Sequence, residues 1–401
     1  MNARIRRTVL AAALVTGIAA GTAGPALATG APAHGRAHTT APATPGTDIE
    51  ALLSDLIAGL PDEGATAALI RLGGTEGAWR GSAGVHDLVT KRPADPDARF
   101  RAGSVTKVFT AATVLQLATE HRLSLDRPVR SYLPELIPAA YGAVTVRQLL
   151  NHTSGLPSAD FPGDTVEEWY ANRFHRFDAR ELVASATAKE REFPAGTRQH
   201  YLNINYTVAG LLIEKVTGHS YEAEVSRRIL APLGLSGTSF PGTDPRIHGP
   251  HNHGYQRMKL EDGTTGLRDV SLWSPTDGWA AGDVISTTAD LERFLTALFR
   301  GRVVRGPLLE EMFTLPDPSV RDFVTGRAPA FSAGLSTWKL GGRQVWGKTG
   351  GRWGYNAGIG ATRDLSRTLV YSINSTDAKA EGENALVMGV VSTVFGAPSA
   401  D

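Results

Sequence analysis

Apolar side chains recur every three or four residues in several stretches of this chain, a spacing that places them on one face of an α-helix. One such stretch begins at Ser104 and continues through Val108, Ala112 and Leu115 as a buried helix. Helices are predicted over residues 48–60 (with Asp48 as the cap), 104–121, 145–150, 206–217, 290–299 and 381–395.

Short β-rich runs lie near both ends of the chain and are separated by glycine turns or polar residues, which is typical of strands. They cover residues 65–72, 77–84, 331–338, 343–348, 355–362 and 368–374.

This order of elements predicts the fold class. Because strands lie at both ends and helices between them, we expect an α/β (α+β) fold whose antiparallel sheet is built from both chain ends and flanked by helices. A mostly helical domain is inserted between the two halves of the sheet. Residues 48–125 and 266–401 are assigned to the sheet domain, and residues 126–265 to the helical domain.

The first 28 residues have the pattern of a secretory signal peptide. Three arginines precede an apolar run at residues 9–20, and residues 26–28 offer a cleavage site of small residues. The run is shorter than the ~20 residues that a membrane span needs, so no stable membrane anchor is expected. Residues 29–47 are predicted to be a disordered leader, and the protein is expected to be secreted and extracellular.

Composition excludes several classes of function. The formal net charge is +1 and no basic stripe is present, so nucleic acid is not an expected partner. The chain has no cysteine, so disulfides and thiolate chemistry are not available. His251 and His253 have no third ligand in a recognisable pattern, so no metal and no cofactor are predicted. His152 is expected to order its own turn.

The pair Ser104 and Lys107 is the first candidate for chemistry. On a helix, residues three apart share a face, so the hydroxyl and the amine lie together. A buried amine without a counter-ion tends to lose its proton, and a neutral lysine beside a serine is a general base beside a nucleophile. The same letters recur at Ser336 and Lys339, but in a predicted strand, where residues three apart point to opposite faces.

A second candidate is Tyr201 with Asn203, which follow a turn rich in Pro and Gly and precede a helix. Tyr201 could take a proton if nearby lysines lower its pKa. Asn203 could bond both a lysine and an amide carbonyl. The alternative is a loop tyrosine that packs its ring and an asparagine that caps the helix.

A third candidate lies at a strand end and contains Lys348, Thr349, Gly350 and Gly351. Lys348 would supply positive charge, Thr349 a hydroxyl, and Gly351 a backbone N–H close to the substrate. Residues 342–349 also match the letters of a phosphate-binding loop. That motif requires a helix after its lysine, whereas the glycines here cannot start one.

The three motifs, in this order, resemble those of the penicillin-recognising serine hydrolases, and most closely class C β-lactamases and secreted D-alanyl-D-alanine carboxypeptidases. The resemblance covers residues 65–395 and implies a β-lactamase/transpeptidase-like fold. It implies that Ser104 is acylated and that Lys107 and Tyr201 share the proton transfers, with the identity of the base left open. Asn203 would orient Lys107 and the substrate amide, and Lys348 would lower the pKa of Tyr201 and attract a carboxylate.

The resemblance further implies an oxyanion hole made by the backbone amides of Ser104 and Gly351. This chain departs from the family at three places. Leu202 stands where a serine is common, and the third motif begins with Lys348 where the carboxypeptidases often have histidine. The arginine that precedes the third motif in those enzymes is replaced by Ser336, with Lys339 or Arg343 as possible substitutes.

The implied function is a monomeric, secreted serine hydrolase that acts on a small peptide, ester or β-lactam through an acyl-enzyme. The first hypothesis is a D-alanyl-D-alanine carboxypeptidase on cell-wall peptides. A β-lactamase, an esterase and a D-amino-acid amidase are alternatives within the class. A non-catalytic sensor of peptides or penicillin is the alternative of another class.

Overall fold

The computed structural model describes residues 45–380, 382 and 384–396. The predicted signal peptide and residues 29–44 of the predicted leader lie outside this range, as does residue 381, where the last helix was expected to begin. Residues 45–47 were expected to be disordered but belong to the first helix. The helices are α1 (Pro45–Ile57), α2 (Thr106–Thr119), α3 (Val146–Leu150), α4 (Val166–Ala171), α5 (Ala179–Thr187), α6 (Ile204–Thr217), α7 (Tyr221–Val225), α8 (Ala231–Leu233), α9 (Thr288–Phe299) and α10 (Ala385–Phe395). Helix α1 begins at Pro45 rather than Asp48, since proline is favoured in a first helical turn.

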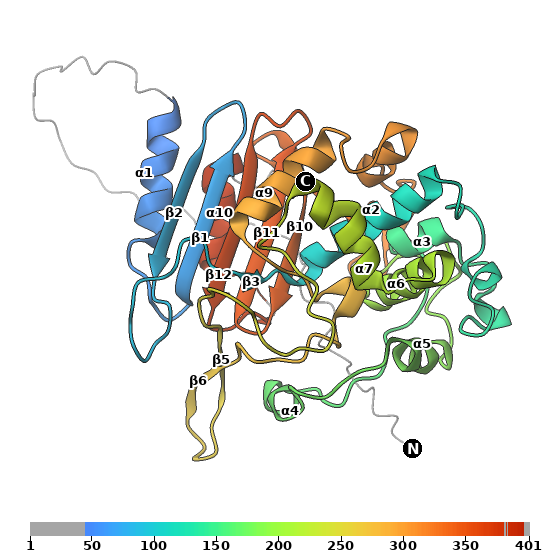
Figure 1. The fold of residues 1–401 in the computed structure, drawn as a ribbon, viewed down its shortest axis with the longest axis horizontal. Helices are drawn as coiled ribbons and strands as arrows, with labels where there is room; N and C mark the ends of the chain where they lie inside the picture. Colours follow the sequence, from blue (N-terminus) through green and yellow to red (C-terminus); the bar gives the residue numbers. More distant parts are fainter. Residues whose placement is uncertain (1–44, 381, 383, 397–401) are drawn as a thin grey trace, which may run out of the picture.

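An antiparallel sheet with the strand order β2-β1-β12-β11-β10-β9 makes up one half of the molecule (Figure 1). Its strands are β1 (Ala65–Gly73), β2 (Trp79–Gly84), β9 (Ser336–Leu340), β10 (Arg343–Arg352), β11 (Tyr355–Thr362) and β12 (Thr368–Ser375). Strand β1 pairs directly with β12, so the prediction of one sheet built from both chain ends is confirmed.

Two strand boundaries differ from the prediction by four residues or more, and the others by two at most. Strand β9 begins at Ser336 rather than residue 331, because a tight turn at Gly334 (φ +86°) bonds Ser332 N–H to Leu335 O. Strand β10 extends past Lys348 to Arg352, because β11 pairs with it from Val345 to Arg352. The remaining strands form short pairs: β3 (Phe100–Arg101) with β7 (Ile285–Ser286), β4 (Arg198–Gln199) with β8 (Arg321–Asp322), and β5 (Tyr255–Lys259) with β6 (Thr265–Asp269).

Helices cover both faces of the sheet. On one face α1 and α10 pack together, and Leu53 and Val390 join a core with Ile70 and Ile373. On the other face lies α9, whose Phe294 belongs to the large core that extends into the helical region. Neighbouring strand residues face opposite cores, as the two-residue period of a strand requires.

The helical region lies beside the β10 end of the sheet, with α2 running between the two parts (Figure 1). Most residues of α2 are buried, Lys107 among them, because the helix contacts α6, α7 and the turn formed by Trp279–Ala281. The division into two domains at residues 126 and 265 stays a prediction; hairpin β5–β6 spans the second boundary.

Candidate active site

Ser104 lies in a single 3₁₀ turn, η1 (Gly103–Val105), that leads into α2. Gly103 has a φ of +52°, a conformation that favours glycine. The Thr106 hydroxyl donates to Gly103 O and accepts from Val284 N–H, which fixes the turn from both sides. Ser104 is partly exposed while its neighbours are buried, so its hydroxyl is the group that this turn presents.

Lys107 is fully buried, and its Nζ lies 3.1 Å from Ser104 Oγ. The same nitrogen donates to Asn203 Oδ1 at 2.7 Å and to Ala281 O at 2.8 Å. Burial lowers the pKa of Lys107 well below its ordinary value, and the charges of Lys348 and Lys379 lower it further. A neutral amine has two N–H groups and one lone pair. Since both N–H groups are used by Asn203 and Ala281, the lone pair is left for the proton of Ser104.

Tyr201 lies between the two lysines of the site. Lys107 Nζ is 4.9 Å and Lys348 Nζ 4.7 Å from the centroid of its ring. The phenol oxygen is buried without a well-formed hydrogen bond from the described residues. The Ser104 hydroxyl is close enough to favour the ionised phenol, but burial dominates and raises the pKa of Tyr201.

This result corrects one expectation, that Lys348 lowers the pKa of Tyr201. The Lys348 ammonium lies over the face of the ring rather than beside the phenol oxygen, and the cost of burying a phenolate exceeds any gain. Tyr201 therefore keeps its proton at neutral pH and is available as a proton donor.

Asn203 is the residue before the first turn of α6, but its side chain makes no capping bond. Its carbonyl oxygen accepts from Lys107 instead. The alternative interpretation, an asparagine that only caps a helix, does not agree with this geometry.

The third motif lies on β10, which is a continuous strand from Arg343 to Arg352 and not a phosphate-binding loop. Pairing with β9 ends at Gly347 and Ser336, so the rest of β10 has an open edge. The turn η1 packs there. A Cβ on Gly350 would lie 2.0 Å from Ala102 O and 2.7 Å from Ser104 N, so only glycine fits this contact. Lys348 is buried and donates to Thr349 O at 2.8 Å.

All three motifs therefore contribute residues to the surroundings of Ser104, and Thr349 lies on β10 between Lys348 and Gly350. Sequence reasoning missed His152, which is buried, has a φ of +61°, and packs its ring 4.5 Å from that of Tyr201. Burial lowers the pKa of His152 well below its ordinary value, so it is a neutral support for Tyr201. The sequence analysis expected His152 only to order its own turn. No signal in the neighbouring residues indicates its contact with Tyr201, which lies 49 positions later in the chain.

Lys379 and Ala281 were also missed. Lys379 Nζ donates to Gly351 O at 2.9 Å, and Ala281 acts through its backbone, which no side-chain motif reveals.

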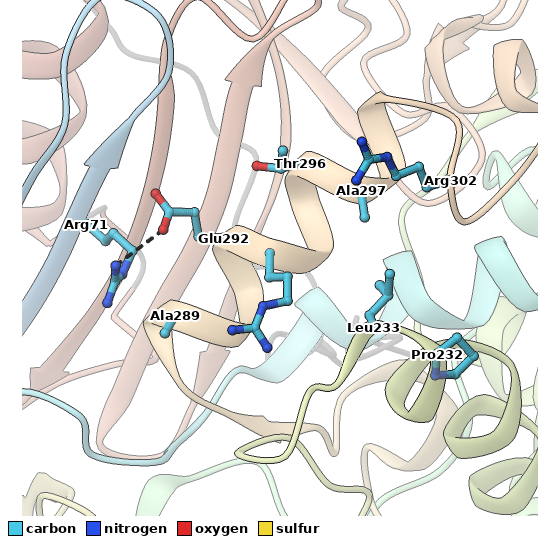
Figure 2. Close-up of a pocket in the computed structure, with 9 residues that line it drawn as sticks. Arg71, Pro232, Leu233, Ala289, Glu292, Thr296, Ala297 and Arg302 are labelled. Atoms are coloured by element: carbon cyan, nitrogen blue, oxygen red, sulfur yellow. Dashed lines mark hydrogen bonds and ion pairs between the residues drawn. The ribbon is translucent and has the colours of Figure 1, made fainter.

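A cavity of about 470 Å³ lies elsewhere, between α8, α9 and β1 (Figure 2). It is lined in part by Arg71 and Glu292, which form an ion pair, and it contains none of the predicted site residues. Across the described part of the chain, no group of three or more His, Asp or Glu side chains is placed to hold a metal ion. Within the same residues, no helix has both the length and the apolar character to cross a membrane.

Comparisons with known proteins find a family model and several solved structures that resemble this chain. The Beta-lactamase family model matches residues 53–391. A D-stereospecific amidohydrolase from Streptomyces sp. has 32% identity and a TM-score of 0.73, over 86% of this chain and 98% of that one. A D-amino acid amidase from Ochrobactrum anthropi SV3 has 26% identity and a TM-score of 0.71, over 87% of this chain and 97% of that one.

Two curated relatives match over shorter regions. Esterase EstB from Burkholderia gladioli is 32% identical over 50% of this chain and 53% of its own length. Protein flp from Staphylococcus aureus (strain N315) is 29% identical over 53% of this chain and 41% of its own length. The chain thus spans about half the length of the curated relatives it matches.

Proposed function

The chain belongs to the beta-lactamase family, and we propose that this serine hydrolase is a D-stereospecific amidohydrolase that cleaves an amide bond through an acyl-enzyme on Ser104. The observation that carries the chemistry is the buried, neutral Lys107, whose free lone pair faces the Ser104 hydroxyl. The stereospecificity rests on the likeness to the Streptomyces amidohydrolase over most of the chain.

In the proposed mechanism Lys107 takes the proton of Ser104 as the oxygen attacks the substrate carbonyl. The backbone N–H groups of Ser104 and Gly351 stabilise the oxyanion. The C–N bond then breaks, and Tyr201 donates its proton to the departing nitrogen while the proton held by Lys107 returns to Tyr201. Water attacks the resulting ester, which releases the acid and restores the Ser104 hydroxyl.

The D-alanyl-D-alanine carboxypeptidase is a second candidate for the same site. It is favoured by Lys348, which lies over the Tyr201 ring, and by Lys379, which donates to Gly351 O, because a peptide with a free carboxylate needs a cation close to the scissile bond. The esterase alternative is supported only by the partial likeness to EstB.

Rates on the D- and L-enantiomers of alanine p-nitroanilide test the proposal. We expect the D-substrate to react about 100-fold faster, because a misplaced carbonyl loses alignment with the nucleophile. The Ser104→Ala variant should have no turnover. Equal rates for the two enantiomers would refute stereospecificity. A stable penicillin adduct without turnover of any amide, ester or lactam would instead favour the sensor.

We further propose that the protein is secreted and acts outside the cell as a monomer on small substrates. Export is supported by the arginines before residue 9, by the apolar run at residues 9–20 and by the predicted cleavage site at residues 26–28. Recovery from the culture medium of a chain lacking residues 1–28, with the mass of a monomer in solution, is the expected result. A chain of full length retained in the cells would contradict it.

A further inference from the structure

The cavity of about 470 Å³ between α8, α9 and β1 follows one face of α9 (Figure 2). Residues spaced three, four, seven and eight positions apart share one side of a helix. Helix α9 contributes five residues at this spacing: Ala289, Glu292, Arg293, Thr296 and Ala297. The other walls come from β1, from α8 and from the loop after α9. The cavity is therefore built by segments from distant parts of the chain that the fold brings together.

The lining of this cavity is positively charged. Three arginines and one carboxylate belong to it: Arg71, Arg293, Arg302 and Glu292. Since Glu292 pairs with Arg71, two positive charges of the lining have no counter-charge there. Arg293 Nη1 donates to Gly234 O at 2.8 Å, which holds the guanidinium in place but leaves its charge. Across the part of the chain that the structure describes, the Arg302 side chain forms no ion pair and no hydrogen bond.

The β1 end of the cavity has a further surplus of charge. Arg80 on β2 is directly opposite Arg71 in the strand register, so the two side chains lie on the same face of the sheet, where like charges are destabilising. The bond from Arg71 to Glu292, at 3.3 Å, uses one of the five N–H donors of the guanidinium. Among the described residues, Arg71 Nε is buried without a hydrogen-bond partner. An anion bound at this end would offer an acceptor and offset the repulsion.

The cations lie at two ends of the cavity. Arg71 lies beside Glu292, whereas Arg302 follows the end of α9, where its backbone N–H donates to Ala297 O at 2.9 Å (Figure 2). Five residues of helix separate Glu292 from Ala297, roughly 7.5 Å along the axis. Helix α8 adds the apolar side chain of Leu233 to the lining. A ligand that contacts both ends therefore needs two anionic groups joined by apolar carbon.

We propose that this cavity binds a small organic dianion, with one anionic group at Arg71, the other at Arg302, and an apolar linker against α8. A guanidinium fork matches carboxylate and phosphate alike, so the anionic group is one of these two. The cavity volume lies within the range of about 300–1,000 Å³ that is usual for small-molecule sites. The site contains none of the residues around Ser104, and the inference does not depend on the proposed function.

Titration calorimetry of the protein at low ionic strength tests the proposal with four probes: suberate, hexane-1,6-bisphosphate, octanoate and inorganic phosphate. We expect at least one of the two dianions to bind, and the one that binds more tightly identifies the anionic group. Octanoate and inorganic phosphate should bind at least about tenfold more weakly, because each can make charge-assisted bonds at only one end. Binding of neither dianion would overturn the inference, as would equal affinity for the dianions and the shorter or singly charged probes.

Variants at the two ends assign the binding to this cavity. Arg302→Gln removes an exposed cation and should weaken binding of the dianion at least about tenfold. The double variant Arg71→Gln with Glu292→Gln removes the ion pair as a whole and should weaken binding at the other end by a similar factor. Arg268→Gln is the matched control, because it removes an exposed arginine from hairpin β5–β6, outside the cavity, and should keep the Kd. An unchanged Kd in Arg302→Gln would overturn the assignment.

A variant of the candidate active site completes the test, because lysines beside Ser104 also attract anions. Lys379→Gln should keep the Kd of the dianion, since Lys379 lies at Gly351 and not in the cavity lining. A loss of binding in Lys379→Gln would place the dianion beside Ser104 and overturn the inference. None of these results affects the proposed function, which depends on Ser104 and on the preference for D-substrates.

Discussion

At the scale of single residues, the protonation state of Lys107 decides the chemistry. Its pKa is lowered by burial, so the amine is neutral where an exposed lysine is charged. Acylation should be present above this lowered pKa and should be lost as the pH falls through it. Lys107→Arg puts a permanent cation where the neutral amine stood and cannot accept a proton, and we expect acylation by an activated ester to fall by about 10²–10⁴-fold. Acylation at the original rate in this variant would show that another group is the base.

Tyr201 allows a separate expectation at the same scale. Because burial raises its pKa, the phenol is a donor, and a donor matters most when the leaving group needs a proton. Tyr201→Phe should therefore slow amide hydrolysis by about 100-fold, while hydrolysis of a nitrophenyl ester changes far less, since nitrophenolate leaves unprotonated. Steady-state rates on matched amide and ester substrates measure this difference. Equal losses on both would make Tyr201 the base for attack.

At the scale of elements, the contact between β10 and the Ser104 turn sets the oxyanion hole. Gly350→Ala would place a Cβ 2.0 Å from Ala102 O, so the strand and the turn must separate. Loss of an oxyanion donor costs about 10²–10³ in kcat, and we expect a loss of that size with an unchanged circular dichroism spectrum. Gly59→Ala is the control, because a Cβ there meets no atom within 4 Å. Full activity in Gly350→Ala would show that the hole lies elsewhere.

Part of the fold and of the candidate site could be predicted from the sequence, and part could not. The pairing of Ser104 with Lys107 follows from helical spacing, and the sheet follows from the β-rich runs at both chain ends. The pKa of Tyr201 could not be predicted in the same way. It depends on burial by residues distant in sequence, such as His152 and Phe331, whose rings lie 4.5 and 4.8 Å from it. Lys379 was missed for the same reason, since its contact with Gly351 depends on the path of the chain across the ends of two strands.

At the scale of the whole molecule, one buried ion pair joins the sheet to the segment that supplies Ala281. Arg352, at the end of β10, bonds both oxygens of Asp277 and also donates to Ser274 O. The two side chains are 8% and 10% exposed, so removal of the carboxylate leaves a buried positive charge without a counter-ion. Asp277→Ala should lower the free energy of unfolding by about 3–5 kcal/mol, measured by urea denaturation.

The double variant Asp277→Ala with Arg352→Leu tests whether this loss comes from the unpaired charge. Replacing both partners removes the buried guanidinium, so the double variant should recover much of the stability that Asp277→Ala loses. Recovery of stability without recovery of activity is the expected pattern, because the segment that presents Ala281 O to Lys107 would still lack its anchor on β10. If the double variant is as unstable as Asp277→Ala, the pair contributes through packing, and the sheet and the Ala281 segment are held together by other contacts.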